Sequence, residues 1–205
     1  MSTKVLNEIF KRLREYKDFP NYQLERRVDI FINYFLERIL SAYLEKEVKF
    51  VCPEFPLKVE KSNSSTKLDY LCKTNNEVIF VELKTDSNSI DHNQALSYLN
   101  TDWKKCLEDL KKITKATKPK YREKYNTLNA AISRMEFETG DHPIKVVYIA
   151  PLPDEKNEFL KKINVGKSKL LSEIKIQLDE DENIVFDYLK TLKLNIFEIG
   201  KMNIK

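Results

Sequence analysis

Glycine is scarce in this chain. Only three glycines occur among 205 residues, at positions 140, 166 and 200. Proteins that hold phosphates with a P-loop or a dinucleotide-binding turn need several glycines close together in one loop. Three widely separated glycines cannot build such a loop, so the sequence excludes both classes.

Cysteine and long apolar runs are also scarce. Cys52, Cys72 and Cys106 are scattered and odd in number, so we expect no disulfide framework and a reducing compartment. No stretch approaches the roughly 18 consecutive apolar residues of a membrane span. The amino-terminal segment has a helical pattern without the apolar core of a signal peptide. These features predict a cytoplasmic protein that does not partner a membrane.

The remaining composition is that of an ordinary globular protein. Apolar residues make up 41% of the chain and charged residues 33%, and the net charge is +4. A chain of this length suits one α/β domain. We therefore predict a single domain over residues 1–205, with a core at about 22–150 and a carboxyl-terminal elaboration over 151–205.

The order of expected elements defines the fold class. Helical spacing of apolar residues predicts a helix over 3–16 and a longer one opened by Pro20 and Asn21. The run over 144–151 predicts a buried strand in the centre of the sheet, a position compatible with parallel pairing. The other expected elements are an extended segment at 47–59, a hairpin at 66–85 and helices at 92–113 and 121–135. After Pro151 we expect a helix at 153–163, a strand at 173–178 and a helix at 183–194. This order predicts a mixed sheet of four to five strands flanked by helices.

The segment VIFVELKTD, residues 78–86, carries the most information about function. It reads as a buried strand, yet Glu82 and Lys84 lie within it. Residues two apart in a strand point to the same face. Buried charges are costly unless something pairs with them, so the pattern indicates a metal ion or a phosphate at this place.

A partner for Glu82 follows from the expected hairpin. If Asn75 and Asn76 form a two-residue turn with positive φ, the register places Asp69 directly opposite Glu82. Their Cβ atoms would then be about 5 Å apart. Two facing carboxylates destabilise a sheet unless a cation lies between them. Mg²⁺ often binds one or two carboxylates together with phosphate oxygens, so we predict Asp69 and Glu82 as ligands of Mg²⁺, with Mn²⁺ as a substitute.

These residues resemble the signature of the PD-(D/E)XK nuclease superfamily. Asp69, a spacer and Glu82-Leu83-Lys84 match its central motif, although Leu68 stands where the named Pro would be. Gln94 and Tyr98 match the QxxxY element of the RecB-like and lambda-exonuclease-like branches. The resemblance covers about residues 22–150. It implies a restriction-endonuclease-like core and metal-dependent hydrolysis of phosphodiester bonds in nucleic acid, with DNA favoured.

The resemblance also implies roles for individual residues. Lys84 would orient or activate the attacking water, or counter developing negative charge. Gln94 and Tyr98 would help hold the metal site or the nucleic-acid backbone. Such nucleases often place a Glu of the first core helix near the metal. A helical wheel puts Glu25 on the inner face and Glu37 on the other side, so Glu25 is the preferred candidate. Glu54 is a weaker one.

A basic segment is the expected nucleic-acid contact. Between positions 104 and 124 there are nine Lys or Arg residues and three acids. With Tyr121 and Tyr125 interspersed, this stretch suits a polyanion, although lysine-rich helices also produce such runs as plain solvated faces. The residues assigned to this contact, besides Tyr98, are Lys111, Lys112, Lys115, Lys118, Lys120 and Arg122.

Alternatives to an active enzyme stay open at this point. The same fold could serve as an inactive nucleic-acid-binding module, or as a subunit of a defence or mobile-element complex that acts only with a partner. A homodimer is also compatible with the sequence. For the charged trio of Asp69, Glu82 and Lys84, the plain alternative is a cross-strand charge cluster on the surface.

Overall fold

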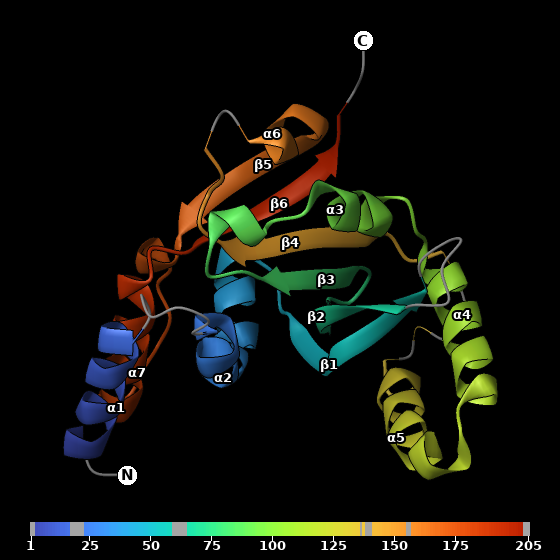
Figure 1. Ribbon diagram of the computed structural model, residues 1–205, viewed down its shortest axis with the longest axis horizontal. Coiled ribbons are helices and arrows are strands. Elements are labelled where there is room, and N and C mark those ends of the chain that lie inside the picture. The colour runs from blue at the N-terminus through green and yellow to red at the C-terminus, as the bar shows by residue number, and fades with distance from the viewer. Residues whose placement is uncertain are drawn as a thin grey trace.

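A six-stranded mixed sheet with helices on both faces forms the centre of the protein (Figure 1). The computed structural model describes residues 3–16, 23–58, 65–135, 137, 141–154 and 157–202. The strand order is β1-β2-β3-β4-β6-β5. Strands β3 and β4 are parallel, and the other neighbouring pairs are antiparallel. The strands are β1 (Lys49–Lys58), β2 (Ser65–Lys73), β3 (Val78–Leu83), β4 (Ile144–Ala150), β5 (Ile163–Leu170) and β6 (Asn195–Lys201).

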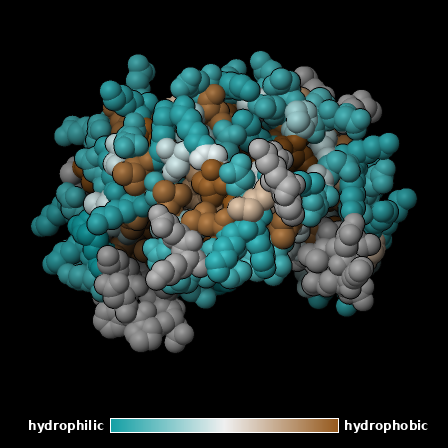
Figure 2. Space-filling view, turned by 90° about the horizontal axis from the view of Figure 1, so that it is seen from above, coloured by the Kyte–Doolittle hydropathy of each residue, from teal (hydrophilic) through white to brown (hydrophobic). Residues whose placement is uncertain are grey.

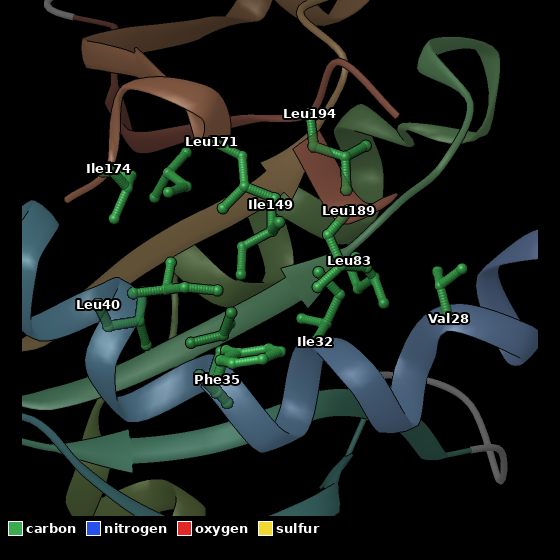
Figure 3. Packing of buried hydrophobic residues seen from close by; sticks show 14 of the residues in the cluster. Val28, Ile32, Phe35, Leu40, Leu83, Ile149, Leu171, Ile174, Leu189 and Leu194 are labelled. Carbon is green, nitrogen blue, oxygen red and sulfur yellow. The ribbon is translucent and has the colours of Figure 1, made fainter. Parts of the chain in front are cut away.

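One face of the sheet is covered by three helices. These are α1 (Thr3–Tyr16), α2 (Leu24–Leu44) and α7 (Glu180–Thr191). Helix α2 lies across β3 and β4, and its Ile32 and Phe35 pack toward Leu83 and Ile149 (Figure 3). The continuous apolar face that predicted a long helix is therefore the side of α2 that meets the sheet.

The opposite face is covered by four helices. These are α3 (His92–Leu99), α4 (Trp103–Ala116), α5 (Arg122–Ser133) and the short α6 (Glu158–Lys162). Tyr98, Trp103, Ile132 and Phe159 bring them into one apolar cluster with side chains of the sheet, such as Phe80. Short 3-10 turns lie at η1 (Ser87–Ser89), η2 (Pro119–Tyr121) and η3 (Leu171–Glu173). Seen from above, the surface is mostly hydrophilic, with hydrophobic residues gathered near its middle (Figure 2).

The predicted hairpin register is confirmed. Tyr70 pairs with Val81, and the next three pairs along the ladder follow the same register. The expected turn conformation is wrong, because neither Asn75 nor Asn76 is among the described residues with positive φ. Instead, the Thr74 hydroxyl accepts hydrogen bonds from the two backbone N–H groups that follow Asn75. A threonine side chain thus closes the turn that we had assigned to asparagine geometry.

The carboxyl-terminal region belongs to the same sheet, which corrects the expected strand number from four or five to six. Strand β6 pairs with β4, and β5 pairs with β6. The strand expected at 173–178 is not a strand. Ile174 is buried, and Ile176 and Leu178 are partly buried against the α2 layer, so the alternation reflects an extended segment lying on helices. Residues 183–194 are helical only as far as Thr191, in α7.

Other expected elements differ from the structure in their bounds. The helix expected over 92–113 is two helices, because the chain leaves α3 after Leu99 and Asp102 caps α4 by accepting from the Lys105 N–H at 2.7 Å. The helix expected over 153–163 is limited to α6 within the described residues. The start assigned to Pro20 and Asn21 lies outside the described residues.

Two further features bear on location and chemistry. In the described part of the chain, no helix is both long and apolar enough to cross a membrane. The three cysteines are free and buried. Burial raises the pKa of the Cys52 thiol to about 12, so this thiol is protonated and unreactive at neutral pH.

Candidate functional site

Lys84 stands at the centre of a cluster of carboxylates at the carboxyl end of β3. Its Nζ lies 2.6 Å from Glu82 Oε1, 3.9 Å from Asp69 Oδ2 and 4.0 Å from Glu25 Oε1. The lysine side chain is only 12% exposed. Three acids from β2, β3 and α2 therefore surround one buried ammonium group. We call Glu25, Asp69, Glu82 and Lys84 the acidic cluster.

Helix α3 holds the carboxylate of Glu82 in place. Tyr98 donates its hydroxyl to Glu82 Oε2 at 2.9 Å, and Gln94 Nε2 donates to Oε1 at 3.0 Å. Gln94 also donates to the Tyr98 hydroxyl at 2.7 Å. The two residues are one helical turn apart, so they share a face of α3. The two residues of the QxxxY element thus both donate hydrogen bonds to Glu82 of β3.

The position of Asp69 follows from the end of the β2–β3 ladder. The last paired residues are Tyr70 and Val81, so Asp69 and Glu82 are not themselves a ladder pair. Beyond that pair, Asp69 Oδ2 accepts a hydrogen bond from the Leu83 N–H at 2.8 Å. The carboxylate of Asp69 replaces a backbone acceptor there and is held next to Lys84.

Glu25 reaches the cluster from the other face of the sheet. It lies in the first turn of α2, where the Thr85 backbone N–H donates to its carboxylate. The end of β3 is where side chains from both helical layers can meet. By contrast, Glu37 accepts from the Phe50 N–H and Glu54 pairs with Lys67, so neither is part of the acidic cluster.

Burial and crowding of like charges raise the pKa of all three acids. For Glu82, burial first and Asp69 second raise the pKa to about 7, against the lowering effect of Lys84. Burial likewise raises the pKa of Asp69 and of Glu25. Burial alone would lower the pKa of Lys84, but its three acidic neighbours outweigh this and raise it. Lys84 is therefore a cation at neutral pH, in a pocket with excess negative charge.

The donor set fits a hard divalent cation with few protein ligands. No group of three or more His, Cys, Asp or Glu side chains is arranged around one point within the residues that the structure describes. Asp69 and Glu82 nevertheless each place a carboxylate oxygen within 3.9 Å of Lys84 Nζ. Mg²⁺ commonly binds one or two carboxylates and completes its shell with water and phosphate oxygens.

The basic residues named from the sequence lie apart from the acidic cluster. Lys111, Lys112 and Lys115 are on α4, and the other three lie between there and the first residue of α5. In Figure 1 the α4–α5 pair stands at the right of the sheet, whereas α2 and the end of β3 lie to the left. The structure brings together the acids, Lys84, Gln94 and Tyr98, but not the six cations.

Sequence reasoning missed a cleft that adjoins the acidic cluster. A space of about 920 Å³ is lined by Glu25 of the cluster, by Thr85, and by Arg14, Arg26 and Lys193. These three cations come from α1, from the first turn of α2 and from the segment after α7. No local motif joins residues so far apart in the chain. We call this space the basic cleft.

Comparison with known proteins adds no family to this description. No protein-family model matches the chain, and neither the curated proteins nor the solved structures give a significant match. The functional conclusion therefore depends on the geometry of the acidic cluster.

Proposed function

We propose that the protein is a metal-dependent nuclease that hydrolyses phosphodiester bonds in nucleic acid, with DNA as the favoured substrate. The observation that carries the proposal is the convergence of Glu25, Asp69 and Glu82 on Lys84 at the end of β3. Mg²⁺ is the expected cofactor, with Mn²⁺ as a substitute. The ion would be held by Asp69 and Glu82, and when bound it would supply charge neutralisation and an activated water.

The electrostatics of the acidic cluster support a cation site. Three carboxylates and one ammonium leave a net negative charge in a partly buried place, where burial is the main cause that raises the pKa of each acid. A divalent cation would offset this negative charge. A plain surface charge cluster would not have this burial, since Glu82 is only 1% exposed.

The side chains around the proposed metal site would support it in different ways. Tyr98 and Gln94 hold the Glu82 carboxylate in one orientation through their hydrogen bonds. Because Tyr98 is fully buried, we assign it to this support and not to direct contact with nucleic acid. Lys84 stays protonated, so it would donate a hydrogen bond to the attacking water or to a phosphate oxygen. It would not act as a general base.

The architecture also favours a restriction-endonuclease-like core. Helix α2, strands β1, β2 and β3, helix α3 and strand β4 occur in that order along the chain, with α4 and α5 between α3 and β4. The order agrees with the one that the resemblance implies. Strands β5 and β6 would then be additions at the β4 edge of that core.

Cleavage assays on two variants test the proposal. We expect Asp69→Asn and Lys84→Ala each to lower the rate of plasmid and single-strand cleavage in Mg²⁺ by about 10²–10³-fold, the range seen when one charge-stabilising group is removed. Lys167→Ala is the matched control, because Lys167 is exposed on β5. Unchanged cleavage in both variants would refute the assigned mechanism. Salt-sensitive binding of DNA without cleavage by the wild-type protein would favour a binding module or a partner-dependent subunit.

A further inference from the structure

The basic cleft carries more positive charge than its neighbour, the acidic cluster. Among the residues that line it, Arg14, Arg26 and Lys193 stand against the acids Glu25 and Asp86. Glu25 is the residue shared with the acidic cluster, and Asp86 caps η1 by accepting from the Asn88 N–H at 2.9 Å. Three cations against two acids leave the lining with a net charge of +1.

The cations of the basic cleft are available to a ligand. All three residues are exposed, and within the described residues none of them forms an ion pair. The Arg14 guanidinium lies over the Tyr188 ring, 5.7 Å from its centroid, which leaves its N–H groups free to meet an anion. Because α1, α2 and the segment after α7 each contribute one cation, the charges come from three separate parts of the lining.

The size of the cleft limits what it can hold. A space of about 920 Å³ is near the upper end for sites that take drug-sized ligands, roughly 300–1,000 Å³. A space of this size suits a few nucleotides of one strand. Proteins that bind single strands use basic grooves that follow the backbone in this way.

We propose that the basic cleft binds the phosphodiester backbone of single-stranded nucleic acid through Arg14, Arg26 and Lys193, and leads it to the acidic cluster. Glu25 lines the cleft and its Oε1 lies 4.0 Å from Lys84 Nζ, so a strand that leaves the cleft beside Glu25 reaches the acidic cluster. The inference rests on the proposed nuclease function for what happens at that point. Binding in the cleft can be measured separately.

Binding of a fluorescein-labelled oligothymidylate, measured by anisotropy in EDTA, tests the inference without cleavage. We expect the triple variant Arg14→Gln/Arg26→Gln/Lys193→Gln to bind at least about tenfold more weakly than wild type. Each phosphate contact on a single strand contributes about 0.7 to the slope of log K against log salt. Loss of three contacts should therefore reduce the slope by about 2.

Matched controls separate the cleft from the basic helices. Lys111→Gln/Lys112→Gln/Lys115→Gln removes the same charge from α4 and should change affinity far less. The double variant Arg26→Gln/Lys193→Gln keeps the Arg14–Tyr188 contact, and circular dichroism melting checks that each variant is folded. Equal affinity and slope for the triple variant and wild type, an equal loss in the α4 variant, or equally tight cleft-dependent binding of a duplex would overturn the inference.

Failure of this inference and failure of the nuclease proposal give different results. If Asp69→Asn abolishes cleavage while the cleft variants bind normally, only the cleft assignment falls. If the cleft variants lose binding while wild type cleaves nothing in any divalent metal, the cleft stands and the nuclease proposal falls.

Discussion

Replacing Glu82 with Gln should change how the stability of the protein depends on pH. The Glu82 carboxyl has a pKa of about 7 in the folded protein, against 4.5 ordinarily. Folding therefore favours the protonated form. The stability that comes from this proton is present in full below pH 4.5 and is lost as the pH rises through about 7.

The size of the effect follows from the shift in pKa. One pKa unit corresponds to about 1.4 kcal/mol, so the wild-type free energy of unfolding should fall by up to about 3 kcal/mol between these limits because of Glu82. Gln has no proton to lose. The free energy of unfolding of Glu82→Gln, relative to wild type, should therefore rise over the same pH range.

Urea unfolding at a series of pH values from about 4.5 to 8.5 measures this difference. Glu8→Gln is the control, because Glu8 is exposed on α1 and pairs with Arg12. A second arm adds Mg²⁺ at pH 8. An ion at a hundred times its dissociation constant stabilises a folded protein by about 2.7 kcal/mol, and we expect this gain in wild type but not in Glu82→Gln. A flat difference curve, or one of the opposite sign, would refute the description of Glu82 as a desolvated acid beside Asp69.

Two further predictions concern buried tyrosines that differ in their hydrogen bonds. Tyr98→Phe should lower the free energy of unfolding by about 1–3 kcal/mol, because it removes the hydrogen bond to Oε2 of the buried Glu82 carboxylate and leaves only the donors to Oε1; thermal or urea unfolding measures this, and the loss should be larger above pH 7, where Glu82 is ionised. Tyr148→Phe should cost less than about 1 kcal/mol or stabilise the protein, because the Tyr148 hydroxyl is buried without a hydrogen-bond partner among the described residues. Equal losses in the two variants would contradict the roles assigned to the hydroxyls.

The register of the β2–β3 hairpin could be predicted because it depends on local information, but the expected direct pairing of Asp69 with Glu82 is wrong, because the ladder ends at Tyr70 and Val81. A short turn and the apolar residues around it set the register of β2 against β3. The preference for Glu25 over Glu37 came from helical periodicity alone, and the structure places Glu25 next to Lys84. Local sequence patterns were sufficient for the register and for Glu25.

The two carboxyl-terminal strands, β5 and β6, could not be predicted from the sequence, because neither shows a regular alternation of apolar and polar residues. The β5–β6 register shifts between Val165 and Ser168, and this irregularity interrupts alternation in β5. In β6 a charged residue, Glu198, lies inside the strand and pairs with Lys145 of β4 at 3.1 Å. Such a pair is visible only when both strands are placed side by side.

The basic cleft depends on packing between distant segments. Arg14 and Lys193 meet because α1 and α7 pack together, as in the stacking of Phe10 on Tyr188. The sequence of neither helix indicates that α1 and α7 pack against each other. The basic run from α4 to α5 was easy to see in the sequence, yet the fold places it away from the acidic cluster, because α4 and α5 cover the β1 side of the sheet.

The prolines of β1 have a consequence for how molecules of this protein meet one another. β1 is an edge strand, and Pro53 and Pro56 lie within it without interrupting it. A proline has no N–H to offer, so a second chain cannot add a strand along the whole of this edge. The edge is thereby protected against aggregation by sheet extension. Self-association through continuous β-pairing would have to use the opposite edge, at β5.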